Sequence, residues 1–281
     1  RLSIVGSEMF RRDRVCKARE YQKQGIKYVE MTDTDLAKNG EPAIKMLEEI
    51  HSIMPLIEKE TVVQIRFLIG IRWIQLTIIK DQKTSNTYLR ENINVLRAVA
   101  KSPYVVGSDF IGEEINDISD LQPAIKEIVR YINEEDKDFT IRIHAGENDS
   151  LRNNVRKSIM CVKESLEKEQ EMPRCRIGHG LYSEDLNTES GKELLKLMKD
   201  TGVVIEFQLT SNVRLNNLSD LKNHPIKIFL KNGIKCVQGT DGGGMYASDP
   251  FDEQLPLQNL LELSDDEFAK MREVADEITT N

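Results

Sequence analysis

Short runs rich in β-branched residues alternate along almost the whole chain with longer stretches whose apolar residues recur at helical spacing. Repeated strand–helix units of this kind build a parallel sheet covered by helices. The alternation therefore limits the chain to an α/β fold. Seven runs have the pattern of strands: residues 26–31, 62–71, 105–111, 139–144, 175–179, 203–209 and 234–240.

The stretches between these runs are predicted to be helices that cover the sheet. In residues 41–54, Pro42 occupies a first-turn position where proline is tolerated, and Ile44, Leu47, Ile50 and Met54 form an apolar stripe. Similar patterns predict helices over residues 89–99, 121–132, 155–166, 192–199 and 224–232, and terminal helices within 252–281.

The length and the pattern together predict one barrel domain spanning residues 1–281. Barrels of alternating strands and helices commonly reach this size, and the chain is 39% hydrophobic. Seven strands are awkward for a closed parallel barrel, which commonly has eight, because an open gap would expose strand edges. The chain also begins with Arg1 rather than Met. We therefore expect a (β/α)8 TIM-type barrel whose first strand is absent from this chain, so that the domain is N-terminally incomplete.

Charge and composition exclude several kinds of partner. The net charge of -8 argues against duplex nucleic acid as a partner, since such binders concentrate Lys and Arg on one face. The four cysteines are scattered, with no CxxC pair, which favours a reducing, cytoplasmic setting. The longest apolar run, around residues 67–79, is broken by Arg72 and Gln75, and it falls short of the roughly 20 residues needed to cross a bilayer. We expect a small-molecule partner and no membrane segment; the oligomeric state stays open.

Three residues with catalytic chemistry lie at the ends of predicted strands. His144 and His179 are two of only four histidines, and Asp241 follows the last predicted strand. Barrels of this type place their active sites at the C-terminal ends of the strands, so these side chains are expected to converge on one rim. Two imidazoles and a carboxylate suit a borderline-soft divalent cation such as zinc.

The residues beside these histidines add to the signal. After His144, two small residues, Ala145 and Gly146, allow a tight turn that brings Glu147 back toward the same space. Glycines flank His179 on both sides, which permits a close approach of backbone to a ligand or a metal. The sequence thus predicts a metal ligand and a proton carrier in one pocket.

Five short motifs together resemble the adenosine deaminase family, which comprises metal-dependent purine deaminases of the amidohydrolase superfamily. They are His-Ala-Gly-Glu at 144–147, Gly-His-Gly at 178–180, Ser-Asn at 211–212, His-Pro at 224–225 and Thr-Asp at 240–241. Their order and approximate spacing match that family. Residues 25–30 and 106–114 are similar to its second and fourth strands, so the likeness covers nearly the whole chain.

The resemblance implies zinc-dependent hydrolytic deamination of an adenine nucleoside or nucleotide, giving an inosine-type product and ammonia, with one Zn²⁺ per subunit. It implies that His144 and Asp241 are metal ligands and that Asp241 also orients the water as a base. Glu147 would protonate the purine ring nitrogen, and His179 would orient and polarise the metal-bound hydroxide.

Three glycines are expected to lie against the substrate. Gly112 resembles the glycine whose backbone faces the purine in that family. Gly146 belongs to the turn between the predicted ligand and the predicted acid. Gly242 follows Asp241 where the family usually has a second Asp that contacts the five-membered ring. Glycines at 242–244 could let a phosphate or a larger group approach the backbone, or could form a loop.

The expected metal site is incomplete within the chain. Relatives that act on adenosine carry a His-x-His pair on the first strand, whereas no histidine precedes His51 here. Catalytic zinc sites usually have at least three protein ligands, so two further histidines are expected upstream of residue 1. An incomplete N-terminus would explain both the missing ligands and the missing strand.

Other interpretations of the same residues remain open. The chain could be a non-catalytic deaminase-like scaffold or a ligand sensor, or another metal-dependent amidohydrolase. His144 could be a structural histidine, His179 could cap a turn, and Asp241 could be an ordinary turn residue before glycines. His224 precedes Pro225 at an expected helix start, which favours capping or packing over catalysis.

Overall fold

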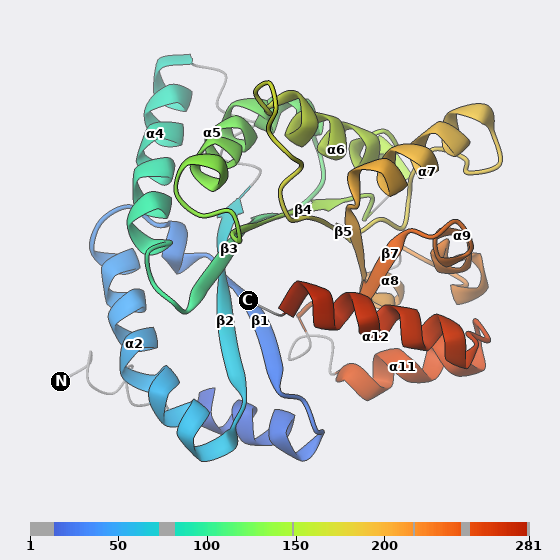
Figure 1. The fold of residues 1–281 in the computed structure, drawn as a ribbon, viewed down its shortest axis with the longest axis horizontal. Coiled ribbons are helices and arrows are strands. Elements are labelled where there is room, and N and C mark those ends of the chain that lie inside the picture. Colours follow the sequence, from blue (N-terminus) through green and yellow to red (C-terminus); the bar gives the residue numbers. More distant parts are fainter. Residues whose placement is uncertain (1–13, 73–81, 148, 216, 243–247, 280–281) are drawn as a thin grey trace. The chain divides into compact units, whose positions relative to one another are not determined.

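The computed structural model describes residues 14–72, 82–147, 149–215, 217–242 and 248–279 (Figure 1). Within these ranges no helix is both long enough and apolar enough to cross a membrane. The chain divides into two compact units, one made of residues 1–72 and 79–109 and the other mainly of residues 110–281. The single domain expected over residues 1–281 stays a prediction.

The first unit contains strands β1 (Tyr28–Asp33) and β2 (Gln64–Arg72), which pair in parallel, and most of β3 (Val105–Ile111). Its helices are η1 (Asp35–Ala37), α2 (Glu41–Thr61) and α4 (Gln82–Val99), and residues 14–23 are also helical. The side chains of Ile65, Phe67 and Ile69 on β2 are fully buried. They form the core of this unit together with Ile50 and Ile57 of α2.

The second unit is built on four consecutive parallel strands, β4 (Thr140–Ala145), β5 (Cys175–His179), β6 (Val204–Phe207) and β7 (Lys235–Gln238). Helix α6 packs on β4 and β5, and α9 and α12 pack on β7 (Figure 1). The helices of this unit are η2 (Ile118–Leu121), α5 (Gln122–Glu134), η3 (Asp149–Leu151), α6 (Asn154–Glu164), α7 (Glu189–Thr201), α8 (Leu209–Arg214), η4 (Leu221–Asn223), α9 (Ile226–Lys231), α11 (Pro250–Asn259) and α12 (Asp265–Thr279).

The seven predicted strands are all present, with ends shifted by a few residues. Two predicted strands, over residues 203–209 and 234–240, end two residues early. The strand predicted over residues 203–209 ends at Phe207, and Leu209 already begins helix α8. The physical reason is a long-range contact, because the Glu253 carboxylate accepts hydrogen bonds from the backbone N–H groups of Leu209 and Thr210. These bonds stabilise the start of a helix that no local pattern indicated.

Helix α2 also differs from its prediction. It continues through Pro55 to Thr61 instead of ending at Met54, and Ile44, which was placed on the apolar stripe, is 59% exposed. An internal proline removes one backbone hydrogen bond. The burial of Ile53, Met54 and Ile57 around Pro55 offsets that loss.

Candidate active site

The turn after β4 carries the first two predicted site residues, His144 and Glu147. Gly146 adopts a φ of 71° between them. A Cβ at this position would lie 2.4 Å from the carbonyl oxygen of Tyr182 and 2.7 Å from a methyl carbon of Val155. Only glycine fits such a turn without displacing the backbone. The turn therefore brings Glu147, which is half-buried, back beside the end of β4.

The end of β5 explains why glycines flank His179. A Cβ on Gly178 would lie 3.3 Å from the His144 ring, so the glycine leaves room for that ring beside the strand. The His144 and His179 ring centroids are 5.3 Å apart. His179 has a φ of 71°, which is rare for a residue with a side chain and is found most often at functional sites. The glycine pattern thus places two imidazoles side by side.

His179 is oriented by the segment that follows β6. Its backbone N–H donates to the Gln208 side-chain oxygen at 3.0 Å, and its Nδ1 lies 2.9 Å from the Asn212 side-chain oxygen. An amide oxygen can only accept, so Nδ1 carries the proton and Nε2 presents a lone pair. Burial lowers the pKa of His179 to about 4, which keeps the imidazole neutral at physiological pH.

Glu147, His179 and Asp241 meet at one point. One ligand atom from each lies within 4.8 Å of the others, and Glu147 Oε1 is 3.7 Å from His179 Nε2. Burial raises the pKa of Glu147, and the nearby carboxylates of Asp241 and Glu114 raise it further, while His144 acts in the opposite direction. A carboxyl group in this setting can carry a proton at a higher pH than usual.

Asp241 reaches this cluster from a loop rather than from a strand. The strand predicted to end at residue 240 ends at Gln238, so Asp241 lies three residues past the strand end instead of directly after it. Its φ of 52° is in the left-handed region, which Asp tolerates better than most residues. Gly242 follows it directly, and residues 243–247, with the other two glycines of the run, lie outside the described residues.

A largely buried ion network lies two residues before His144 and Gly178 on strands β4 and β5. Arg142 and Arg176 are neighbours across β4 and β5, two residues before His144 and Gly178, and they therefore share a sheet face with those residues. The Glu206 carboxylate on β6 forms an ion pair with each arginine, with 3.1 Å between the arginine Nη1 and the nearest carboxylate oxygen. The positive charge of Arg142 helps to lower the pKa of His179. The network thus favours the neutral imidazole.

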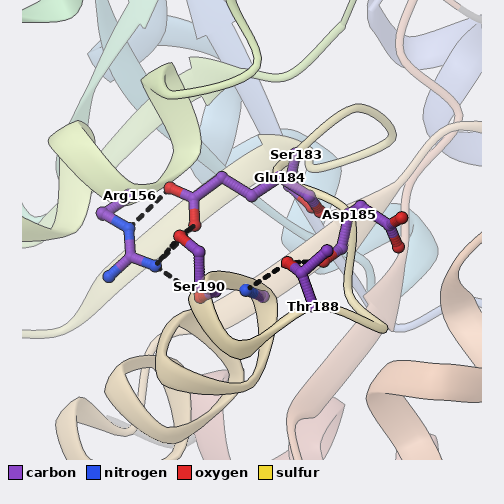
Figure 2. Close-up of polar contacts among 7 residues, drawn as sticks. Arg156, Ser183, Glu184, Asp185, Thr188 and Ser190 are labelled. Atoms are coloured by element: carbon purple, nitrogen blue, oxygen red, sulfur yellow. Dashed lines mark hydrogen bonds and ion pairs between the residues drawn. The ribbon is translucent and has the colours of Figure 1, made fainter.

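The loop after His179 is fixed by a second polar cluster, shown in Figure 2. Arg156 on α6 makes a bidentate pair with Glu184, with Nε 2.6 Å from Oε1, and Ser190 Oγ donates to the same carboxylate at 2.7 Å. Thr188 caps α7 by accepting from the Gly191 N–H at 3.2 Å. These contacts anchor the segment that contains Tyr182, whose N–H donates to the Gly146 carbonyl at 2.8 Å.

We expect Glu184→Gln to lower the free energy of unfolding at neutral pH by no more than about 1 kcal/mol, because the pair is near the surface. Hydrogen bonding to Arg156 lowers the pKa of Glu184 below its ordinary value of 4.5. A group with a lowered folded pKa contributes stability above its unfolded pKa and loses it as pH falls through the folded pKa. The wild type and the variant should therefore converge in urea unfolding as the pH falls below 4.5. A difference that grows toward acid pH would contradict this assignment.

The remaining predicted residues have the following positions. Gly112 follows β3 with a φ of 120° and is exposed, and Gly242 is half-buried. His224 is buried, and its Nδ1 accepts the Ile226 N–H at 3.2 Å where α9 begins. Its ring also packs edge-on against Phe207 at 4.9 Å, which agrees with the capping and packing role expected from the sequence.

Sequence reasoning missed the residues that hold the site in place. Glu114 accepts hydrogen bonds from the backbone N–H groups of Gly146 and Glu147. Asn212 orients His179, and Glu253 stabilises the start of the helix that carries Asn212. Asn212 and Glu114 do occur within the stretches that carried the family resemblance, but nothing in their local pattern indicated these partners.

Proteins similar in sequence to this chain include adenosine deaminases. The adenosine deaminase family profile matches residues 5–278. The adenosine deaminase of Plasmodium gallinaceum is 34% identical over 166 residues. That alignment covers 59% of this chain and 40% of the relative, so it spans less than half of the relative's length.

Solved structures show the same fold. The adenine deaminase of Arthrobacter aurescens superposes with a TM-score of 0.71 at 15% identity, covering 98% of this chain and 75% of that one. The Arabidopsis protein ADAL, complexed with IMP, gives a TM-score of 0.67 at 19% identity, covering 94% and 72%. The fold is the α/β TIM-type fold of the amidohydrolases, as the strand pattern and the motifs predicted. With the family profile matching nearly all of its residues, the chain belongs to the adenosine deaminase family.

Proposed function

We propose that the protein catalyses hydrolytic deamination of an adenine nucleoside or nucleotide, giving an inosine-type product and ammonia, with zinc as its cofactor. The clustering of Glu147, His179 and Asp241, with the His144 ring 5.3 Å from the His179 ring, carries this proposal. An acid, a neutral imidazole and a carboxylate are the groups that hydrolysis of an amidine carbon requires.

The side chains fit a zinc ion in their chemistry. An imidazole nitrogen and carboxylate oxygens are common zinc ligands, and a structurally similar amidohydrolase carries bound Zn. We assign His144 and Asp241 as ligands of one Zn²⁺ per subunit, as the family resemblance implies; His144 is not among the three residues whose ligand atoms cluster, and its ring centroid lies 5.3 Å from that of His179. When bound, zinc supplies hydroxide at neutral pH by lowering the pKa of water from about 15.7 to about 7.

We propose that Glu147 is a proton donor and not a zinc ligand, because its environment favours a protonated carboxyl group. Burial raises its pKa, which favours a protonated carboxyl that can donate to a purine ring nitrogen. Donation draws electrons from the amidine carbon and makes that carbon open to attack by water. The proton that Asp241 takes from the attacking water is passed to the amine nitrogen, which leaves as ammonia when the carbon–nitrogen bond breaks, and the remaining hydroxyl proton of the adduct restores the carboxylic acid of Glu147.

His179 orients the attacking water. Its Nε2 lone pair accepts a hydrogen bond from that water, and the Asn212 contact at Nδ1 holds the tautomer that makes this possible. The Asp241 carboxylate, which belongs to the same cluster, takes up the proton that the water loses. The backbone at Gly112 and the turn at Gly146 are proposed to lie against the purine, with Gly242 beside Asp241.

The substrate class is proposed as compounds that contain adenine, in nucleoside or nucleotide form. The match to adenosine deaminases supports the base, and the solved neighbours include complexes with IMP and GMP and an N6-mAMP deaminase, which support a nucleotide. Gly242 removes the side chain that usually contacts the five-membered ring. A glycine at this place leaves space for a bulkier or charged substituent.

The test is release of ammonia or methylamine by the zinc-loaded protein with its complete natural chain. Adenosine, AMP and N6-methyl-AMP are supplied in turn, and a chelator is added in a parallel reaction. We expect release from at least one compound, loss of release with the chelator, and recovery on adding zinc. A zinc-loaded protein that binds these purines but releases no amine from any of them would show the non-catalytic scaffold instead.

A further inference from the structure

A buried carboxylate joins the segment after β3 to the turn that carries Glu147. Glu114 is 2% exposed. Its Oε1 accepts the Gly146 N–H at 3.1 Å, and its Oε2 accepts the Glu147 N–H at 2.9 Å. Two consecutive backbone donors are thus bound by the two oxygens of one side chain. Charge-assisted bonds of this kind are stronger than neutral ones, so the backbone of Glu147 has little freedom.

Asn154, the first residue of α6, holds the carboxylate in place. Its Nδ2 donates to Glu114 Oε1 at 2.8 Å and to the Asn116 carbonyl at 3.2 Å. Its side-chain oxygen accepts the Ile118 N–H at 3.1 Å. Asn154 is 1% exposed, so its amide and the Glu114 carboxylate are both shielded from water. Buried polar groups that all have partners make a region rigid.

We propose that Glu114 is a positioning residue for the reaction, which fixes Glu147 at the purine ring; this inference rests on the proposed function. Glu114 is two residues from Gly112, whose backbone is proposed to face the purine. One buried side chain therefore sets the spacing between two groups that contact the same flat ring. Misplacement of a reacting group by about 1 Å can lower a rate by about 10²-fold.

The pattern of donors and acceptors requires a carboxylate at position 114. Three N–H groups converge on its two oxygens. Glutamine has one oxygen and one NH₂ group, so in Glu114→Gln the NH₂ would face a backbone N–H and at least one bond would be lost. The shape of the side chain is unchanged. The loss should loosen the turn without emptying the space that the side chain fills.

The experiment compares E114Q with E113Q in the zinc-loaded protein. Glu113 is exposed and carries the same charge one residue away, and among the described residues its side chain makes no hydrogen bond to the turn. Three quantities are measured: kcat and KM for amine release, bound zinc, and hydrogen exchange at the amides of residues 146 and 147. For E114Q we expect kcat to fall by about 10²-fold, with zinc content and KM nearly unchanged and exchange at both amides faster. E113Q should keep the amide exchange and zinc content of the wild type and change kcat only slightly, because the Glu113 charge helps to raise the pKa of Glu147.

Two outcomes separate this inference from the proposed function. Suppose that the wild type is active and that E114Q has the same kcat although its amides at residues 146 and 147 exchange faster. This result would overturn the positioning role of Glu114 and leave the proposed function standing. A wild type without turnover would overturn the proposed function and the inference with it. If E114Q does not fold, N154A serves as the second variant. It keeps the carboxylate but removes its orienting partner, and a smaller fall in kcat is expected; an unchanged kcat in folded N154A would count against the proposal.

Discussion

Replacing Glu147 by glutamine is expected to lower kcat/KM for amine release by about 10²–10⁴-fold, the usual contribution of a general acid or base. The amide keeps the shape of the side chain but has no proton to transfer to the ring nitrogen. The protein should stay folded, because Glu147 is only half-buried and its backbone N–H still donates to Glu114. The measurement is steady-state kinetics of ammonia release at several pH values.

The zinc content of E147Q shows whether Glu147 is a proton donor or a metal ligand. The Glu147 carboxylate lies close enough to His179 and Asp241 to bind a cation with them. If Glu147 is the acid, E147Q keeps its zinc and loses turnover. If it is a ligand, E147Q loses zinc as well. E113Q, which removes an exposed carboxylate nearby, is the matched control and should keep both. Full turnover in E147Q would show that the acid assignment is wrong.

Gly146→Ala should cause the largest loss of stability among single-methyl changes in the site. The Cβ would lie 2.4 Å from the Tyr182 carbonyl oxygen, a contact between backbone segments that cannot rotate away. We expect about 1 kcal/mol from the left-handed conformation and a further 1–3 kcal/mol, roughly, from the overlap. Because the turn must shift to relieve the overlap, amine release should fall together with the free energy of unfolding.

Gly202→Ala is the control for this change. Gly202 ends α7 with a φ of 65°, close to the 71° of Gly146, but a Cβ there meets nothing within 4 Å. The variant should lose only the conformational part, about 1 kcal/mol, and should keep full activity. Urea unfolding of both variants gives the difference. An equal loss of unfolding free energy in the two variants would mean that the turn at Gly146 can accommodate a methyl group and does not fix Glu147.

The strands were predictable because their signal is local. Runs such as residues 62–71 and 105–111 are short and contain several Val and Ile residues, and both coincide with strands to within two residues. Helix α8 was not predictable in this way, since Thr210 and Ser211 have no apolar periodicity and follow directly on a strand. Its start depends on Glu253, which is more than 40 residues further along the chain, beyond the reach of local patterns.

In the candidate site too, residues in local motifs were predictable and partners distant in sequence were not. His144, Glu147 and His179 were found because small residues beside them form recognisable motifs. The structure adds the reason for those motifs: Gly178 leaves room for the His144 ring, and Gly146 permits the turn. Glu114 and Asn212 hold the site through hydrogen bonds that span 32 or 33 residues in sequence. Partners that are distant in sequence become visible only when the fold brings them together.

The central claim is that three separate segments of the chain enclose one cation, with His144 and Asp241 as its ligands. Anomalous diffraction at the zinc absorption edge, from crystals of the zinc-loaded protein, locates that cation directly. We predict one strong peak at about 2.0–2.2 Å from a His144 ring nitrogen and from an Asp241 oxygen, with Glu147 outside bonding distance. A peak bound elsewhere, or none beside these residues in protein that contains zinc, would contradict the claim.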